Sequence, residues 1–208
     1  INALLVTDEA GEPMGVVSKS DIMGAYYAAL PIASPLAHIM VGPPLFCEPE
    51  AALETALDSM RTSSVYRLYV LDPETQRVIG ALAYPDIVGL LYKYCHECEY
   101  SHLGQKGKAG PDAIKRYCVG EIMTGDVLAV KETDSVLQAV EVLSAYRFGA
   151  VMVRSGGGEP AGVISKTDLA LAYKQGIPTD TPAGEIMSSP VQLCREDDLL
   201  EAAIKTMI

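Results

Sequence analysis

The sequence predicts an α/β protein (α+β repeats) in which a unit of strand, helix, strand, strand and helix recurs in tandem. Three observations lead to this prediction. An apolar hairpin with a similar ending occurs three times, and a pattern built around an Ile-Met pair also occurs three times. Of the 208 residues, 49% are hydrophobic, which is enough to fill a buried core.

The hairpin pattern occupies residues 3–21, 67–86 and 150–168. In each copy an apolar run precedes a turn rich in Gly, Pro, Asp or Glu, and a second apolar run leads to a helix start. The first and third copies end in GVVSKSD and GVISKTD, which differ only at chemically similar positions, whereas the second copy ends in GALAYPD. We therefore expect two equivalent helix starts and one divergent helix start.

The second pattern begins at Leu36, Val119 and Ala183. Each copy reads as an Ile-Met pair, a short apolar strand, an acidic turn and a helix. In the middle copy Thr133 or Asp134 is expected to cap the helix. The apolar stripe expected on that helix, at 3-4-3 spacing, consists of Val136, Ala139, Val140 and Leu143.

Joining the two patterns divides the chain into repeats. The repeats at 36–93 and 114–174 are complete, and residues 94–113 form an insertion between them. Residues 1–30 hold only the back half of a unit, and residues 183–208 hold only a front half. Three explanations stay open: the chain is cut from a four-unit protein, residues are missing between its parts, or its two ends pack together as one composite unit.

Composition excludes several classes of partner. A formal net charge of -11 repels a nucleic-acid backbone, so no nucleic-acid partner is expected. Five cysteines in no regular framework indicate a reducing, cytoplasmic location. No Asp, Glu, Lys or Arg stands between Asp21 and Glu48, but four prolines there favour a buried helix end and a linker over a membrane span. No membrane partner is expected, and no signal peptide is visible.

The repeat resembles the CBS domain, the regulatory domain named after cystathionine beta-synthase. The Ile-Met pair before a short strand and the Gly-apolar-apolar-Ser-x-x-Asp ending carry this resemblance, which covers nearly the whole chain except roughly residues 94–113. In that family two units pair through their sheets to form a Bateman module. The resemblance therefore implies tandem CBS units paired in this way, and it leads us to expect a homodimer.

The resemblance also implies a function in regulation. Bateman modules commonly bind adenosine-containing ligands such as AMP, ADP, ATP or S-adenosylmethionine in the cleft between two units, and a partner or attached domain responds. No cofactor is expected to be required. The sequence shows no nucleophile–base pair, no phosphate-binding Walker loop and no complete metal constellation, so this chain is not expected to be an enzyme, although a catalytic domain could lie outside it.

The two Ser-x-x-Asp turns have a structural and a functional interpretation. Ser18 with Asp21, and Ser165 with Asp168, fit a capping box that stabilises a helix start by about 1 kcal/mol. A carboxylate can also accept hydrogen bonds from both hydroxyls of a ribose. The resemblance assigns the Ser and Asp of this motif to the ribose of a bound nucleotide.

The rest of the expected nucleotide site combines cations and apolar residues. Lys19 and Lys166 stand at the helix starts, where a cation and free amides suit a phosphate group, although a solvated surface lysine is the plainer interpretation. The family pattern predicts adenine contacts in the third repeat at Thr124, Val127, Phe148, Gly149 and Ala150, and in the fourth repeat at Ser188 and Val191. For Val127 and Ala150 the alternative is an ordinary core position.

The middle repeat departs from the pattern. Ala83 replaces the Ser, and Pro85 stands directly before Asp86. Proline suits the first turn of a helix, and Asp86 can still cap it, but the hydroxyl is lost. We therefore expect a mainly structural repeat whose ribose site is impaired or empty.

The insertion offers a third function. On a continuing helix Cys95, Cys98 and His102 would share one face, which is half of a zinc site or a redox pair; two ordinary cysteines on a helix are the alternative. We therefore weigh three hypotheses: a nucleotide-sensing regulatory module, a structural or dimerisation module with empty clefts, and a metal or redox sensor.

Overall fold

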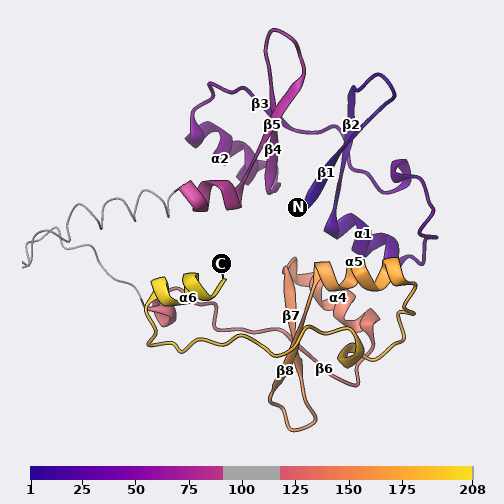
Figure 1. The fold of residues 1–208 in the computed structure, drawn as a ribbon, viewed down its shortest axis with the longest axis vertical. Helices are drawn as coiled ribbons and strands as arrows, with labels where there is room; N and C mark the ends of the chain where they lie inside the picture. Colours follow the sequence, from indigo (N-terminus) through magenta and orange to yellow (C-terminus); the bar gives the residue numbers. More distant parts are fainter. Residues whose placement is uncertain (91–117, 208) are drawn as a thin grey trace, which may run out of the picture. The chain divides into compact units, whose positions relative to one another are not determined.

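A computed structural model describes residues 1–90 and 118–207 of the chain (Figure 1). The contacts within the chain define two compact units. Unit 1 comprises Ile1–Val6, Val16–Met40 and Ile114–Ile208. Unit 2 comprises Thr7–Gly15 and Val41–Ala113.

Unit 1 contains a complete repeat. Its elements, in chain order, are β6 (Ala129–Lys131), α4 (Val136–Tyr146), β7 (Ala150–Arg154), β8 (Pro160–Ser165) and α5 (Lys166–Gln175). The sheet order is β6-β7-β8; β6 runs parallel to β7, and β7 runs antiparallel to β8. This is the predicted succession of strand, helix, strand, strand and helix.

Helix α4 supplies the core of this repeat. The four stripe residues predicted for it are all buried and pack with β7, β8 and α5. The expected cap at Thr133 or Asp134 is wrong, because Ser135 is the N-cap and forms a capping box with Gln138. The Asp134 carboxylate instead accepts a hydrogen bond from the backbone amide of Lys131 at 2.8 Å, which stabilises the preceding turn.

Unit 1 also contains elements of the other repeats. From the first repeat come β1 (Ala3–Thr7) and β2 (Pro13–Ser18), which form a two-stranded sheet whose tip belongs to unit 2, and α1 (Lys19–Tyr27). The short helix η1 (Leu36–His38) begins the second repeat, η2 (Val119–Glu121) lies in the third, and the fourth contributes η3 (Ala183–Glu185) and α6 (Leu200–Met207). The segment that follows η3 pairs with the third repeat, because Ser188 bridges Val163 of β8 in antiparallel fashion. A front half therefore adds to the hairpin of the repeat before it.

Unit 2 repeats the same topology. Its elements are β3 (Phe46–Cys47), α2 (Leu53–Thr62), β4 (Arg67–Leu71), β5 (Val78–Ala83) and a helix over residues 84–90. The sheet order is β3-β4-β5, with β3 parallel to β4 and β4 antiparallel to β5. Its core is smaller and is built around Ala56, Met60 and Leu68. Two separately folded repeats therefore share one succession of elements.

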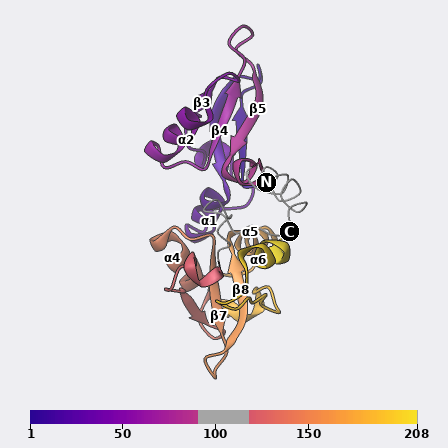
Figure 2. The ribbon, with the colours of Figure 1, turned by 90° about the vertical axis from the view of Figure 1, so that its left-hand side faces the viewer.

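Helices α1 and α5 pack against each other in unit 1, as both ribbon views show (Figures 1 and 2). The rings of Tyr26 and Tyr173 lie 5.4 Å apart between them. The Tyr26 hydroxyl donates to the carbonyl of Ile177, and the Tyr173 hydroxyl donates to the carbonyl of Leu30, both at 2.6 Å. Burial raises the pKa of Tyr26. A tyrosine of each helix is thus hydrogen-bonded to the segment that follows the other helix.

None of the described helices is long and apolar enough to cross a membrane. The uncharged stretch between Asp21 and Glu48 contains α1, η1 and β3, separated by loops. This agrees with the predicted helix end and linker.

The first prediction concerns the tyrosine contacts. Tyr26→Phe should lower the free energy of unfolding by about 1–2 kcal/mol, because the part-buried carbonyl of Ile177 loses its donor. Tyr27→Phe, at the neighbouring and 53% exposed side chain, should change it by less than about 0.5 kcal/mol. Urea unfolding of both variants measures this difference, and equal losses would show that the Tyr26 hydrogen bond does not contribute.

The second prediction concerns the pairing of the fourth repeat with β8. A Cβ at Gly162 would lie 2.5 Å from Sδ and 3.0 Å from Cβ of Met187, whereas a Cβ at Gly149 would meet nothing within 4 Å. Gly162→Ala should therefore destabilise the protein by about 1–3 kcal/mol through overpacking, and Gly149→Ala should not. Thermal unfolding of the pair provides the measurement. An unchanged midpoint for Gly162→Ala would contradict the close approach of Met187.

Candidate functional site

The two Ser-x-x-Asp turns form the capping boxes that the sequence predicts. Ser18 is the N-cap of α1, and Ser165 is the N-cap of α5. In the first turn Asp21 Oδ2 accepts hydrogen bonds from the amide and the hydroxyl of Ser18, both at 2.7 Å. In the second turn Asp168 Oδ2 accepts the same two bonds from Ser165 at 2.7 and 2.6 Å. Each carboxylate is therefore held in one orientation.

The second oxygen of each carboxylate is what remains for a ligand. Asp21 Oδ1 accepts no hydrogen bond from any residue that the structure describes, and Asp168 Oδ1 accepts one from the Ser188 hydroxyl at 2.9 Å. Both side chains are half-buried. A carboxylate oxygen offers two lone pairs, so both Asp residues retain acceptor capacity toward a diol.

The strand before each turn adds a neighbouring backbone segment. Ala150 pairs with Ser165 across the β7–β8 ladder, and the carbonyl of Gly149 accepts the amide of Lys166 at 3.1 Å. Phe148, 40% exposed, directly precedes this segment. At the start of α1 the carbonyl of Asn2, which directly precedes β1, accepts the amide of Lys19 in the same way, at 3.1 Å. The sequence reasoning missed Asn2, although it aligns with Gly149 when the two hairpins are superimposed by sequence.

The structure gives the exposure of the other residues predicted to contact adenine. Thr124 is exposed, Val127 is 55% exposed, and neither has a hydrogen bond to Asp168 within the described ranges. The hydroxyl that does reach Asp168 belongs to Ser188 of the fourth repeat. Val191, three residues further on, is half-buried. The structure therefore joins the turn of the third repeat to the front half of the fourth repeat.

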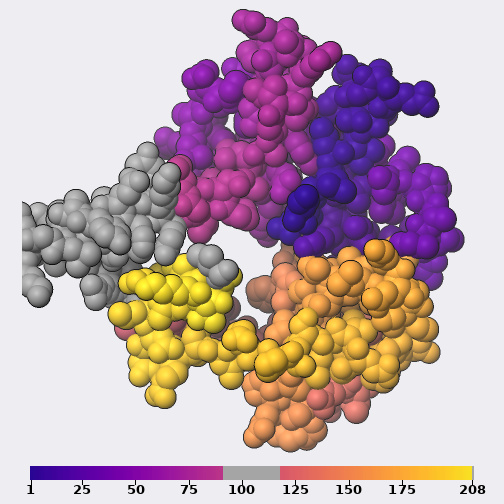
Figure 3. Space-filling view, viewed as in Figure 1, coloured from indigo at the N-terminus to yellow at the C-terminus, as the bar shows by residue number. Residues whose placement is uncertain are grey.

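The two lysines cross between the helices. Lys19 Nζ donates to Thr167 Oγ1 at 2.7 Å, and Lys166 Nζ donates to Ser20 Oγ at 2.9 Å. Burial lowers the pKa of Lys166, and the nearby carboxylate of Asp21 acts in the opposite direction. In the space-filling view the surfaces of the segments that carry α1 and α5 touch (Figure 3). The sequence did not indicate this exchange.

The turn in unit 2 keeps the cap without the hydroxyl. Asp86 Oδ2 accepts the amide of Ala83 at 2.8 Å, and a helix begins at Tyr84. Pro85 therefore stands in the first turn, as predicted. Because Ala83 is an alanine and Tyr84 stands where the other turns have lysine, this turn lacks two of the polar groups found in unit 1.

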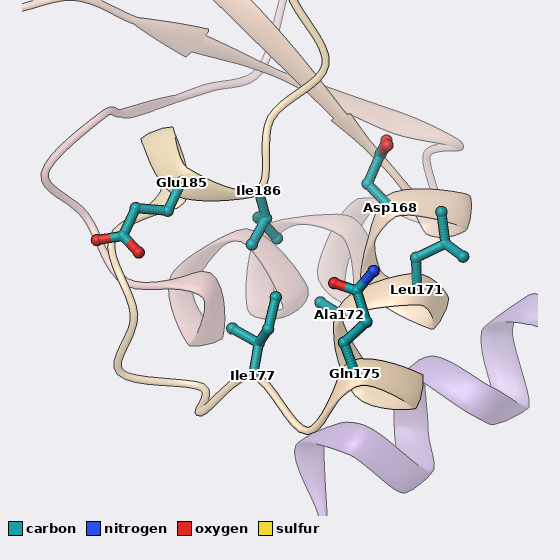
Figure 4. Close-up of a pocket in the computed structure, with 7 residues that line it drawn as sticks. All are labelled: Asp168, Leu171, Ala172, Gln175, Ile177, Glu185 and Ile186. Atoms are coloured by element: carbon teal, nitrogen blue, oxygen red, sulfur yellow. The ribbon is translucent and has the colours of Figure 1, made fainter.

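A small pocket lies beside α5 (Figure 4). Its volume is about 210 Å³, below the roughly 300–1,000 Å³ of typical ligand sites. Ile177 and Ile186 point toward each other across it, and the carboxylates of Asp168 and Glu185 lie toward opposite ends. The pocket extends the surroundings of Asp168 with apolar surface.

The metal and redox hypothesis depends on Cys95, Cys98 and His102, which lie outside the described residues. Among the described residues no three His, Cys, Asp or Glu side chains gather in a way that could hold a metal ion. Cys47, Cys118 and Cys194 are free thiols.

Comparisons with known proteins agree with the repeat. A family model for the CBS domain matches residues 1–28, 36–93 and 119–175. The uncharacterized protein MK0525 of Methanopyrus kandleri is 30% identical over 97 residues, which is 46% of this chain and 50% of that protein. The match thus spans about half the length of this relative.

Solved structures share the fold over nearly the whole chain. Protein MJ1225 of Methanocaldococcus jannaschii has a TM-score of 0.74 at 16% identity, covering 99% of this chain and 77% of its own. An uncharacterized conserved protein of Pyrococcus horikoshii has a TM-score of 0.56 at 18% identity, with coverages of 99% and 78%. At these identities the likeness shows the fold alone. Since the family model matches well over half of the chain, in three segments, the chain belongs to the CBS-domain family.

Proposed function

We propose that this chain is a regulatory module that senses an adenosine-containing ligand and passes a conformational change to a partner or an attached domain. One observation carries the proposal: two equivalent turns in unit 1 each present an oriented carboxylate next to a lysine. The ligand classes are AMP, ADP or ATP, with S-adenosylmethionine as a further candidate.

The carboxylates suit a ribose. In each turn the Ser hydroxyl and amide bind one oxygen of the Asp, which fixes the plane of the carboxylate before a ligand arrives. An oriented acceptor loses little conformational entropy on binding, so this arrangement favours recognition of a vicinal diol. The helix caps and the ribose contacts therefore use the same side chains without conflict.

The lysines suit a phosphate. The chain carries a net charge of -11, so anions are repelled from most of its surface. Lys19 and Lys166 stand at two helix N-termini, whose free amides add positive potential. This locally positive region on a negatively charged chain favours nucleoside phosphates over neutral nucleosides.

The third prediction compares two turns that share a cap and differ in the site. Asp168→Asn should weaken AMP binding at the turn of α5 about tenfold or more, because a charged acceptor is lost, and should leave binding at the turn of α1 unchanged. Asp86→Asn disturbs an equivalent cap in a turn without the Ser and Lys, and it should change AMP affinity less than about twofold. Isothermal titration of both variants with AMP gives the comparison.

Two outcomes would contradict the proposed function. If AMP, ATP and S-adenosylmethionine all fail to bind the unaltered chain, the structural or dimerisation hypothesis replaces it. If Asp86→Asn weakens AMP binding as much as Asp168→Asn does, the Asp residues act through the helix caps and not through the ligand.

A further inference from the structure

The contacts between α1 and α5 are reciprocal at every polar position. Lys19 donates to Thr167, and Lys166 donates to Ser20. The lysines are equivalent in the repeat, and so are the two hydroxyl residues that accept from them. The two helix starts are therefore related by an approximate two-fold exchange.

Each ammonium reaches the hydroxyl residue that directly precedes the Asp of the opposite turn. Ser20 directly precedes Asp21, and Lys166 reaches Ser20 at 2.9 Å. Asp21 acts electrostatically on Lys166. On the other side Lys19 reaches Thr167, the residue directly before Asp168, at 2.7 Å. Each lysine stem thus crosses from its own turn to the neighbouring turn.

We propose that each lysine serves the nucleotide held by the opposite turn: Lys166 binds the phosphate of a ligand on Asp21, and Lys19 binds the phosphate of a ligand on Asp168. This inference rests on the proposed function and assigns the phosphate contacts within it. The neighbouring hydroxyls of Ser20 and Thr167 hold the two ammonium groups in place until a ligand arrives.

The exchange of partners is favourable for an anionic ligand. A hydroxyl is a neutral acceptor, whereas a phosphate oxygen forms a shorter, charge-assisted hydrogen bond with an ammonium. Lys166 is partly withdrawn from water, so its charge gains more from an anion than that of a fully exposed lysine. A ligand without a phosphate gains nothing from this exchange.

The crossing links the two sites. A ligand on either turn binds groups from both helices, so its binding strengthens the α1–α5 contact that the other site also needs. The same charges select the ligand: a phosphate is attracted by the lysine pair, and the sulfonium of S-adenosylmethionine is repelled by it. The sites are therefore specific for nucleoside phosphates.

The test isolates each turn within the 208-residue chain. Asp168→Asn leaves the turn of α1, and Asp21→Asn leaves the turn of α5. Into each background either Lys19→Met or Lys166→Met is introduced, since Met keeps most of the apolar stem. Isothermal titration then measures the affinity for AMP and, as a control without phosphate, for adenosine.

The expected pattern is crossed. In the Asp168→Asn background Lys166→Met should weaken AMP binding about tenfold, and Lys19→Met should change it less than about twofold. In the Asp21→Asn background the two effects should exchange. Adenosine affinity should stay constant throughout, a result that a purely structural role for the lysines would not give.

Three results would overturn the inference. An uncrossed pattern, in which each lysine affects its own turn, assigns the phosphates the other way while leaving the proposed function intact. Equal loss of AMP and adenosine affinity makes the lysines structural. If AMP does not bind the unaltered protein at all, the proposed function fails first, and this inference fails with it.

Discussion

The contact between α1 and α5 is the interaction on which the candidate site depends. It brings together two helix starts that are far apart in the sequence. Each helix contributes residues at equivalent positions of the repeat. Tyrosine hydroxyls form hydrogen bonds near the C-terminal ends of the two helices, and lysine ammonium groups form hydrogen bonds at their N-terminal ends. Because the two segments are copies of one repeat, a single residue pattern supplies both halves of the interface.

The capping boxes connect this interface to function. A helix start needs an acceptor for its free amides, and Ser18 and Ser165 provide it through ordinary local hydrogen bonds. The same geometry turns one Asp oxygen toward the cap and leaves the other for Ser188 or for a ligand. In unit 2 Ala83 keeps the helix and loses the hydroxyl, so the fold and the polar site separate within one chain.

Local patterns predicted the fold well. The apolar stripe of α4, the succession of strands and helices in the complete repeats, and the caps at Ser18 and Ser165 follow from residues close in sequence. The cap of α4 was mispredicted because three consecutive residues can cap a helix, and only the reciprocal bond from Gln138 selects Ser135. The crossing of Lys19 and Lys166 needs the packing of distant helices, which no local pattern contains. The same holds for Ser188, which approaches Asp168 because the fourth repeat pairs with β8 of the third.

A crystal structure of the chain with AMP tests the central claim most directly. The account predicts one ribose on Asp21 and one on Asp168, with the phosphates bound by Lys166 and Lys19, respectively, and both lysines moved off Ser20 and Thr167. AMP bound away from these turns would contradict the account. So would phosphates directed into solvent while both lysines keep their hydroxyl partners.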